Sequence, residues 1–128
     1  MANRALNHPS MLAVAVLLAA LDPVGGARAD PLHVRDSVPE FEGFVQGRHA
    51  EYVVRFDGLI DHSSSRIEIT QSGQVVQSFP AFFDSAPDVL FASGEAPVPG
   101  RYILRWQARS SVDGTISSGE IPFSVKGW

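Results

Sequence analysis

Alternation of apolar and polar residues with a period of two is the feature that most constrains how this chain folds. In the segment 101–109, Tyr102, Leu104 and Trp106 fall on one side, whereas the charged residues fall on the other. Because successive side chains of a β-strand point to opposite faces, this pattern predicts a strand with one buried face. Further segments that read as strands are 51–56, 66–70, 74–79, 88–92 and 118–126.

Turn-forming pairs separate these segments. Ser72-Gly73 and Asp113-Gly114 are examples, and such signals recur about every 8–12 residues. No long segment after residue 30 shows the 3.6-residue period of an amphipathic helix. We therefore predict an all-β domain, an immunoglobulin-like Greek-key β-sandwich of about seven strands. Between its sheets we expect the large aromatic side chains Phe56, Tyr102, Trp106 and Phe123.

The first 29 residues have the composition of a secretory signal. Residues 11–21 are uninterruptedly apolar, Pro23 and two glycines follow, and Ala27-Arg28-Ala29 places small residues where a signal peptidase cleaves. The apolar run is too short to cross a bilayer core of ~30 Å as a helix. We predict a signal peptide over residues 1–29 and one periplasmic domain over residues 30–128, with no membrane span after cleavage.

Composition excludes several classes of function. The chain has no cysteine, so disulfides and thiolate metal sites are impossible. Both methionines, Met1 and Met11, lie in the predicted signal peptide, which leaves no thioether ligand in the domain. The formal net charge of −4 gives no electrostatic reason to bind nucleic acid. The sequence contains none of the common catalytic motifs G-x-S-x-G and H-E-x-x-H, and no phosphate-binding glycine loop. We therefore expect that the protein is not an enzyme and has no catalytic residues.

Four segments resemble a known family. They are HVRDSVP at 33–39, PGRYILRW at 99–106, and SSVDG at 110–114 followed by SGEIPFSV at 118–125. These are similar to the conserved pieces of the CopC-type periplasmic copper-resistance proteins. The resemblance implies a β-sandwich that binds copper, as Cu(II), for buffering, resistance or delivery. The receiving partner would be a CopD-like copper transport protein of the inner membrane.

The resemblance also implies an altered metal site. In that family, Cu(II) is held by an N-terminal histidine and by the aspartate and histidine of a D-x-H turn. Asp113 stands at the aspartate position, but Thr115 replaces the histidine. The predicted N-terminal residue is Asp30, and His33 lies downstream of the position of the terminal histidine, after Pro31 and Leu32. The family fold would nevertheless bring His33 near Asp113.

Cu(II) prefers nitrogen and oxygen donors. We therefore predict a site formed by His33 and His62, with Asp113 and Asp61 supplying oxygen. Each residue also has a plain structural interpretation: Asp61 would cap a turn, Asp113 would form a turn with Gly114, His62 would be solvated, and His33 would be a strand-edge histidine. If those interpretations hold, the alternative function is a metal-free interaction domain that binds another envelope protein.

Cleavage after Ala29 is directly testable. The mature protein should start at Asp30, because Ala27-Arg28-Ala29 follows the apolar run at the spacing that the peptidase requires. Intact-mass analysis of the periplasmic fraction measures this. A membrane-associated species that retains Met1 would contradict the prediction.

Overall fold

Two β-sheets form the domain. The computed structural model describes residues 31–80 and 85–127, so the predicted signal peptide lies outside the described residues. One sheet has three strands in the order β1-β3-β6, with bounds Val34–Val38, His49–Phe56 and Val89–Glu95. The other has five strands in the order β2-β8-β7-β4-β5, with bounds Gly43–Gln46, Ile116–Lys126, Gly100–Arg109, Arg66–Gln71 and Gln74–Pro80.

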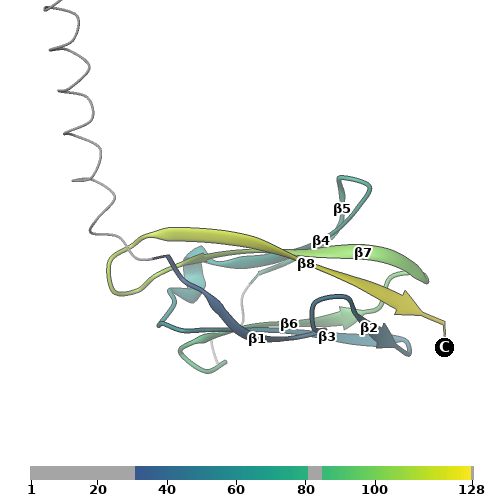
Figure 1. Cartoon of the computed structure of the whole chain (residues 1–128), viewed down its shortest axis with the longest axis horizontal. Coiled ribbons are helices and arrows are strands. Elements are labelled where there is room, and N and C mark those ends of the chain that lie inside the picture. The colour runs from purple at the N-terminus through teal and green to yellow at the C-terminus, as the bar shows by residue number, and fades with distance from the viewer. Residues whose placement is uncertain (1–30, 81–84, 128) are drawn as a thin grey trace, which may run out of the picture. The chain divides into compact units, whose positions relative to one another are not determined.

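The sheets lie one above the other, as Figure 1 shows for β8, β7 and β4 over β1, β3 and β6. All strand pairs are antiparallel except β2 with β8. The one helix among the described residues is the short 3-10 helix η1, His62–Ser64. The predicted all-β sandwich is therefore confirmed. Within the described part of the chain, no helix has the length and apolar character needed to cross a membrane.

The described residues form eight strands, and two of them, β1 and β2, lie outside the segments that the alternation identifies. β2 is four residues long and buries only Val45, so it is too short to show a period in the sequence. It pairs with β8 only from Phe123 onward. Pro122 lies just before that point, and its carbonyl accepts a hydrogen bond from the Glu42 N–H. In a strand, the N and the C=O of one residue point to the same side. The missing N–H of Pro122 therefore faces the side of β8 away from β7, where β8 has no paired strand before Phe123.

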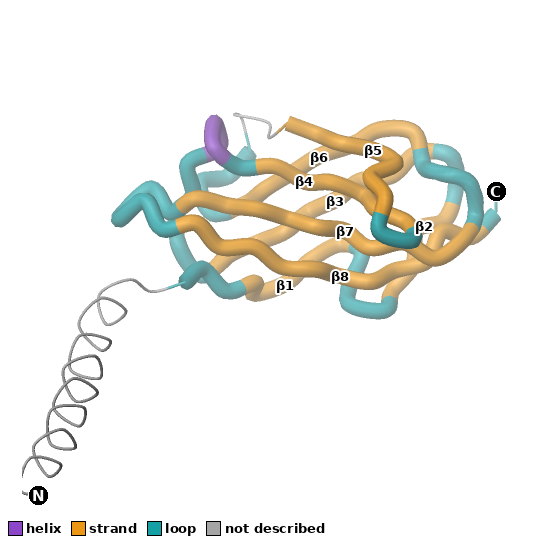
Figure 2. The backbone as a smooth tube through the Cα atoms, turned by 90° about the horizontal axis from the view of Figure 1, so that it is seen from above, coloured by secondary structure: helices purple, strands orange, loops and turns teal. Residues whose placement is uncertain are grey.

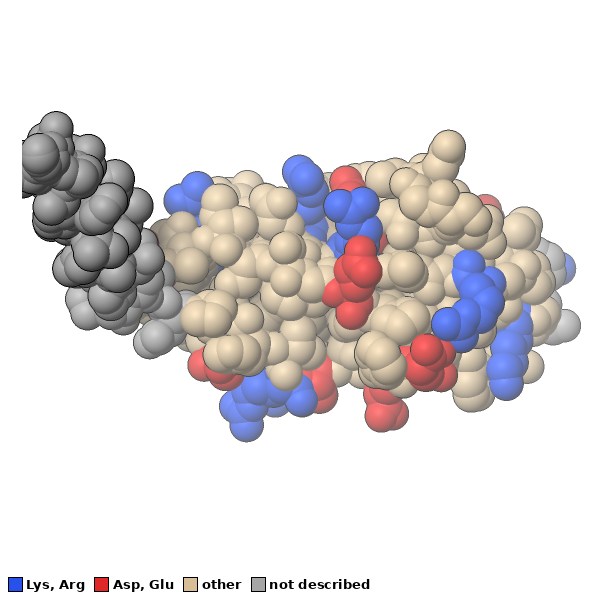
Figure 3. All heavy atoms as spheres, turned by 45° about the horizontal axis from the view of Figure 1, so that its top comes forward, with Lys and Arg blue, Asp and Glu red and all other residues tan. Residues whose placement is uncertain are grey.

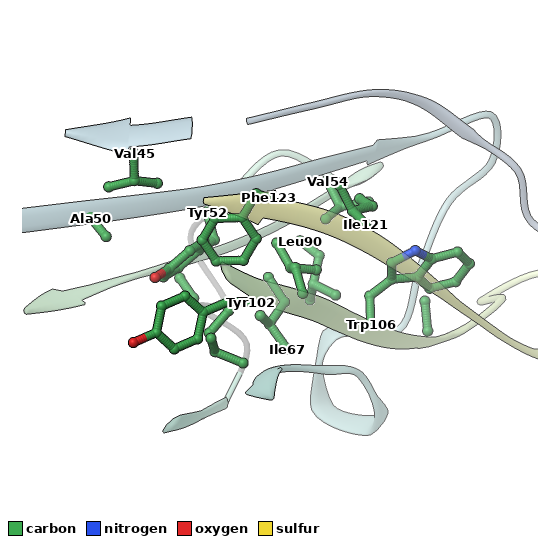
Figure 4. Close-up of a cluster of buried hydrophobic side chains, with 14 of the residues drawn as sticks. Val45, Ala50, Tyr52, Val54, Ile67, Leu90, Tyr102, Trp106, Ile121 and Phe123 are labelled. Atoms are coloured by element: carbon green, nitrogen blue, oxygen red, sulfur yellow. The ribbon is translucent and has the colours of Figure 1, made fainter. Parts of the chain in front are cut away.

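The core lies between the sheets and is built from the predicted apolar faces. Phe56 and Phe123 are fully buried, Tyr102 is 3% exposed and Trp106 is 7% exposed. Figure 4 shows side chains from both sheets meeting there, Tyr52 and Val54 from one and Tyr102, Trp106 and Phe123 from the other. The inner face of β7 alternates as predicted, with Tyr102, Leu104, Trp106 and Ala108 all buried.

The Trp106 indole packs closely against β8 because residue 119 of that strand is a glycine. The indole also packs edge-on against Phe56, with ring centroids 4.9 Å apart. The cross-strand partner of Trp106 on β8 is Gly119. A Cβ at that glycine would approach the indole Cζ2 to 2.6 Å, well inside van der Waals contact. The close approach of β8 to the indole therefore requires a residue without a side chain.

Gly119→Ala should destabilise the domain by ~1–3 kcal/mol, the usual cost of overpacking a filled core. Gly127→Ala is the control, because a Cβ at Gly127 would meet nothing within 4 Å. Urea unfolding of the two variants measures the difference in the free energy of unfolding. Equal stability of Gly119→Ala and the parent would show that the indole can be moved without cost.

Candidate functional site

One end of the sandwich gathers the residues that the sequence singles out. We call it the loop end; it consists of residues 31–33, 57–65 and 110–115. Backbone hydrogen bonds join its parts: the Asp61 N–H donates to the Arg109 carbonyl at 2.8 Å, and the Ser111 N–H donates to the Leu59 carbonyl at 3.0 Å. Figure 2 shows η1 at this end of the strands, with the C-terminus at the other end.

The N-terminal segment is attached to this end by Leu32. Its side chain is 7% exposed and belongs to the core, and its backbone N–H donates to Ser117 Oγ at 2.9 Å. Ser117 lies at the start of β8, just after the 110–115 turn. The N-terminal segment therefore contacts the strand that follows this turn at Leu32, one residue before the candidate ligand His33. That His33 lies near Asp113 stays a prediction.

His33 is paired with a carboxylate that the sequence analysis did not select. Its backbone N–H donates to Asp57 Oδ1 at 2.9 Å, and its Nδ1 lies 2.9 Å from Asp57 Oδ2. The Asp57 N–H in turn donates to the His33 carbonyl at 3.0 Å. Asp57 is the first residue after β3, so the three contacts fix the imidazole against the end of that strand.

The pairing sets the chemistry of both groups. The hydrogen bonds from the backbone N–H and then from the imidazole of His33 lower the pKa of Asp57, which stays ionised at neutral pH. An ionised carboxylate only accepts, so Nδ1 carries the proton, and in the neutral imidazole Nε2 keeps its lone pair. The His33 side chain is 68% exposed. The structure thus presents Nε2 to solvent, oriented by a carboxylate in the manner of metal-binding histidines.

Asp61 has the structural role that its alternative interpretation described. Its side chain accepts hydrogen bonds from the Ser63 N–H at 3.1 Å and the Ser63 hydroxyl at 2.6 Å, which caps η1. The Ser64 hydroxyl is a third donor at 3.4 Å. These contacts, led by the Ser63 hydroxyl, lower the pKa of Asp61.

His62 is bound to the protein rather than solvated. Its Nε2 lies 2.8 Å from the Val89 carbonyl and 3.0 Å from Ser85 Oγ. A carbonyl can only accept, so Nε2 of His62 carries the proton and Nδ1 is the nitrogen with a free lone pair. A metal at His62 would therefore bind through Nδ1, the opposite nitrogen to that of His33.

Asp113 closes its own turn. Its Oδ1 accepts from the Thr115 N–H at 2.9 Å, and that hydrogen bond is the main reason for its lowered pKa. Gly114 has φ of 76°, which a residue with a side chain rarely adopts. Thr115, at the family's histidine position, thus contributes its backbone N–H to the carboxylate.

The four predicted ligands share the loop end but do not converge. Asp61 and His62 line a hollow together with Ser110, Ser111 and Gly114, so the η1 segment does reach the 110–115 turn. Within residues 31–80 and 85–127, however, no three His, Asp or Glu side chains are close enough to hold one ion. Within the described residues, the histidine that lies against a carboxylate is instead His33, with its Nδ1 2.9 Å from Asp57 Oδ2. The only sequence signal for Asp57 is a carboxylate directly after a buried strand, which turn residues also show.

The contact of His33 with Asp57 should respond to acid in a predictable direction. Because the pKa of Asp57 is lowered from its ordinary value of 3.8, the contact should persist at pH 5 and be lost as the pH falls below 3.8. The amide chemical shift of His33, followed by NMR, measures this. In Asp57→Asn that shift should show no transition in the same range, and an unchanged transition would contradict the assignment.

Comparisons with known proteins identify the fold and the family. The family model described as CopC domain matches residues 34–126. A comparison with curated proteins gives no match. Among solved structures, CopC from Methylosinus trichosporium OB3b is 27% identical, with a TM-score of 0.64 over 75% of this chain and 94% of that chain. An engineered protein matches with 20% identity and a TM-score of 0.55, over 77% of this chain and 20% of its own, which shows the fold alone. The chain belongs to the CopC family.

Proposed function

We propose that this protein binds Cu(II) in the periplasm, with His33 as the anchoring ligand. The single observation that carries the proposal is the His33–Asp57 pair, in which an exposed imidazole has its Nδ1 held by a carboxylate and its Nε2 open. Imidazole nitrogen is a preferred donor for Cu(II), and a carboxylate on the other ring nitrogen raises the affinity of the ligand.

The remaining donors are proposed from the same end of the domain. They are His62 through Nδ1 and the carboxylates of Asp61 and Asp113. Asp61 and Asp113 are ionised at neutral pH, as a metal ligand must be. A single ion that uses them together with His33 would require the loops to move, because the described side chains do not converge around one point. His33 would therefore be the preformed ligand, and His62, Asp61 and Asp113 would move to complete the site.

An exposed site fits transient storage and transfer better than permanent retention. The His33 side chain is 68% exposed and that of Asp57 is 43% exposed, so another protein could approach the ion directly. Ligand exchange needs such access, since the receiving ligands must enter before the first ones leave. We propose copper buffering and delivery to an inner-membrane transport protein of the CopD type, in keeping with copper resistance as the family role.

Calorimetric titration of residues 30–128 with Cu(II), and with Zn(II) in parallel, tests the proposal. His33→Ala should weaken Cu(II) binding at least about tenfold, and Asp57→Asn should weaken it by roughly 10–100-fold, the usual effect of removing the partner of a metal-binding histidine. His49→Ala is the matched control: His49 is also an exposed histidine, but it begins β3, whereas Asp57 follows its last residue. Binding should also weaken from about pH 7 to pH 5, because protons compete with the metal for imidazole.

The variants distinguish the competing assignments. Loss of binding in His62→Ala as well as in His33→Ala would place both imidazoles on one ion. Loss in His33→Ala alone would restrict the site to the N-terminal pair. If the parent binds no copper, or if His33→Ala binds as the parent does, the site is absent, and the metal-free interaction domain becomes the better description.

A further inference from the structure

A second hollow lies beside the loop end, on the outer face of the five-stranded sheet. Its volume is about 550 Å³. Its polar wall is formed by Ser63, Ser64 and the guanidinium-bearing side chains of Arg66 and Arg109, and its apolar wall includes Pro80 and Ile116. Among the described residues that line it there is no carboxylate. We call it the arginine hollow.

Arg109 is the unusual member of this set. It ends β7, is only partly exposed, and has its Nε buried without any hydrogen-bond partner. The structure gives its guanidinium no ion pair with a carboxylate in residues 31–80 or 85–127. Burying a charged donor without a partner is costly, so most buried arginines are paired. The position of Arg109 therefore calls for an explanation outside its present contacts.

The neighbouring charged residues do not explain the position of Arg109. Asp61 is the nearby carboxylate whose pKa Arg109 helps to lower, but its oxygens already accept from Ser63 and Ser64. Arg66 is held only loosely, with its Nε 3.7 Å from Glu68 Oε2, and its side chain is 55% exposed. Two guanidinium groups thus border the hollow with donors to spare. Guanidinium is the side-chain group best suited to bind a carboxylate by two parallel hydrogen bonds.

We infer that the arginine hollow binds a small organic carboxylate, with the carboxylate on Arg109 and its apolar part against Pro80 and Ile116. We expect this orientation of the ligand because the hydrogen-bond donors lie on η1, β4 and β7, whereas the apolar surface lies on β5 and β8. Ile116 is the first residue of β8 and lies opposite Arg109 in the sheet. Its side chain is 53% exposed. An apolar group in the hollow would cover that exposed isoleucine.

Titration of residues 30–128 with sodium benzoate, followed by backbone amide NMR, tests the inference. Benzoate should shift the amides of Ser63, Ser64, Arg109 and Ile116 in a saturable way. Acetate should bind more weakly because it has no apolar part, and neutral benzamide should not bind because it has no charge. Inorganic phosphate is the competing probe; tighter binding of phosphate than of benzoate would overturn the carboxylate assignment.

Variants on one strand provide the matched comparison. Arg109→Met should weaken benzoate binding by roughly 10-fold or more, the usual effect of losing a charge-assisted hydrogen bond. Arg105→Met removes the same charge from the same face of β7, outside the arginine hollow, and should leave binding unchanged. Ile116→Ser should weaken benzoate but not acetate, and it alters an exposed residue, so the fold should survive. Absence of saturable shifts, or equal loss in both arginine variants, would refute the inference; neither result bears on copper binding at His33.

Discussion

The packing of the inner face of β7 is the interaction on which the rest of the domain depends. β7 is hydrogen-bonded on both sides, to β8 and to β4, so its inner side chains lie at the centre of the larger sheet. Trp106 connects the two sheets through Phe56, which ends the strand that leads to Asp57. The position of the Asp57 carboxylate, and through it that of the His33 imidazole, therefore depends on contacts made in the core rather than in the loops.

The buried framework follows closely from the sequence, because burial of one face leaves a periodic signal. Tyr52, Val54 and Phe56 occupy every second position of β3 and are all fully buried. The candidate site is different, since its geometry depends on which loop residues meet. The sequence places His33 and Asp57 24 residues apart, and nothing in either segment indicates that they hydrogen-bond. His62 is likewise directed toward Val89, 27 residues away, by loop conformation rather than by any pattern.

The outer surface distributes charge in small balanced groups. Glu68, Arg105 and Glu120 face one another in register across β4, β7 and β8, so opposite charges alternate across the larger sheet. Figure 3 shows acidic and basic side chains interspersed over the face it presents, rather than one extended field. Long-range attraction of a metal ion to that face is correspondingly weak, which leaves recognition to local groups such as the carboxylate of Asp57.

The attachment of the N-terminal segment has a consequence for the thermodynamics of the whole domain. β1 is an edge strand that pairs only with β3, and the segment before it is secured by the buried Leu32 side chain, by the Leu32 N–H on Ser117 and by the contacts of His33 with Asp57. Edge segments with few contacts open locally long before global unfolding. Because the His33 imidazole is oriented only when this segment is closed, any ion that binds there favours the closed form over the open one. An ion bound at His33 would thus slow the opening of β1 and the exchange of its amide protons.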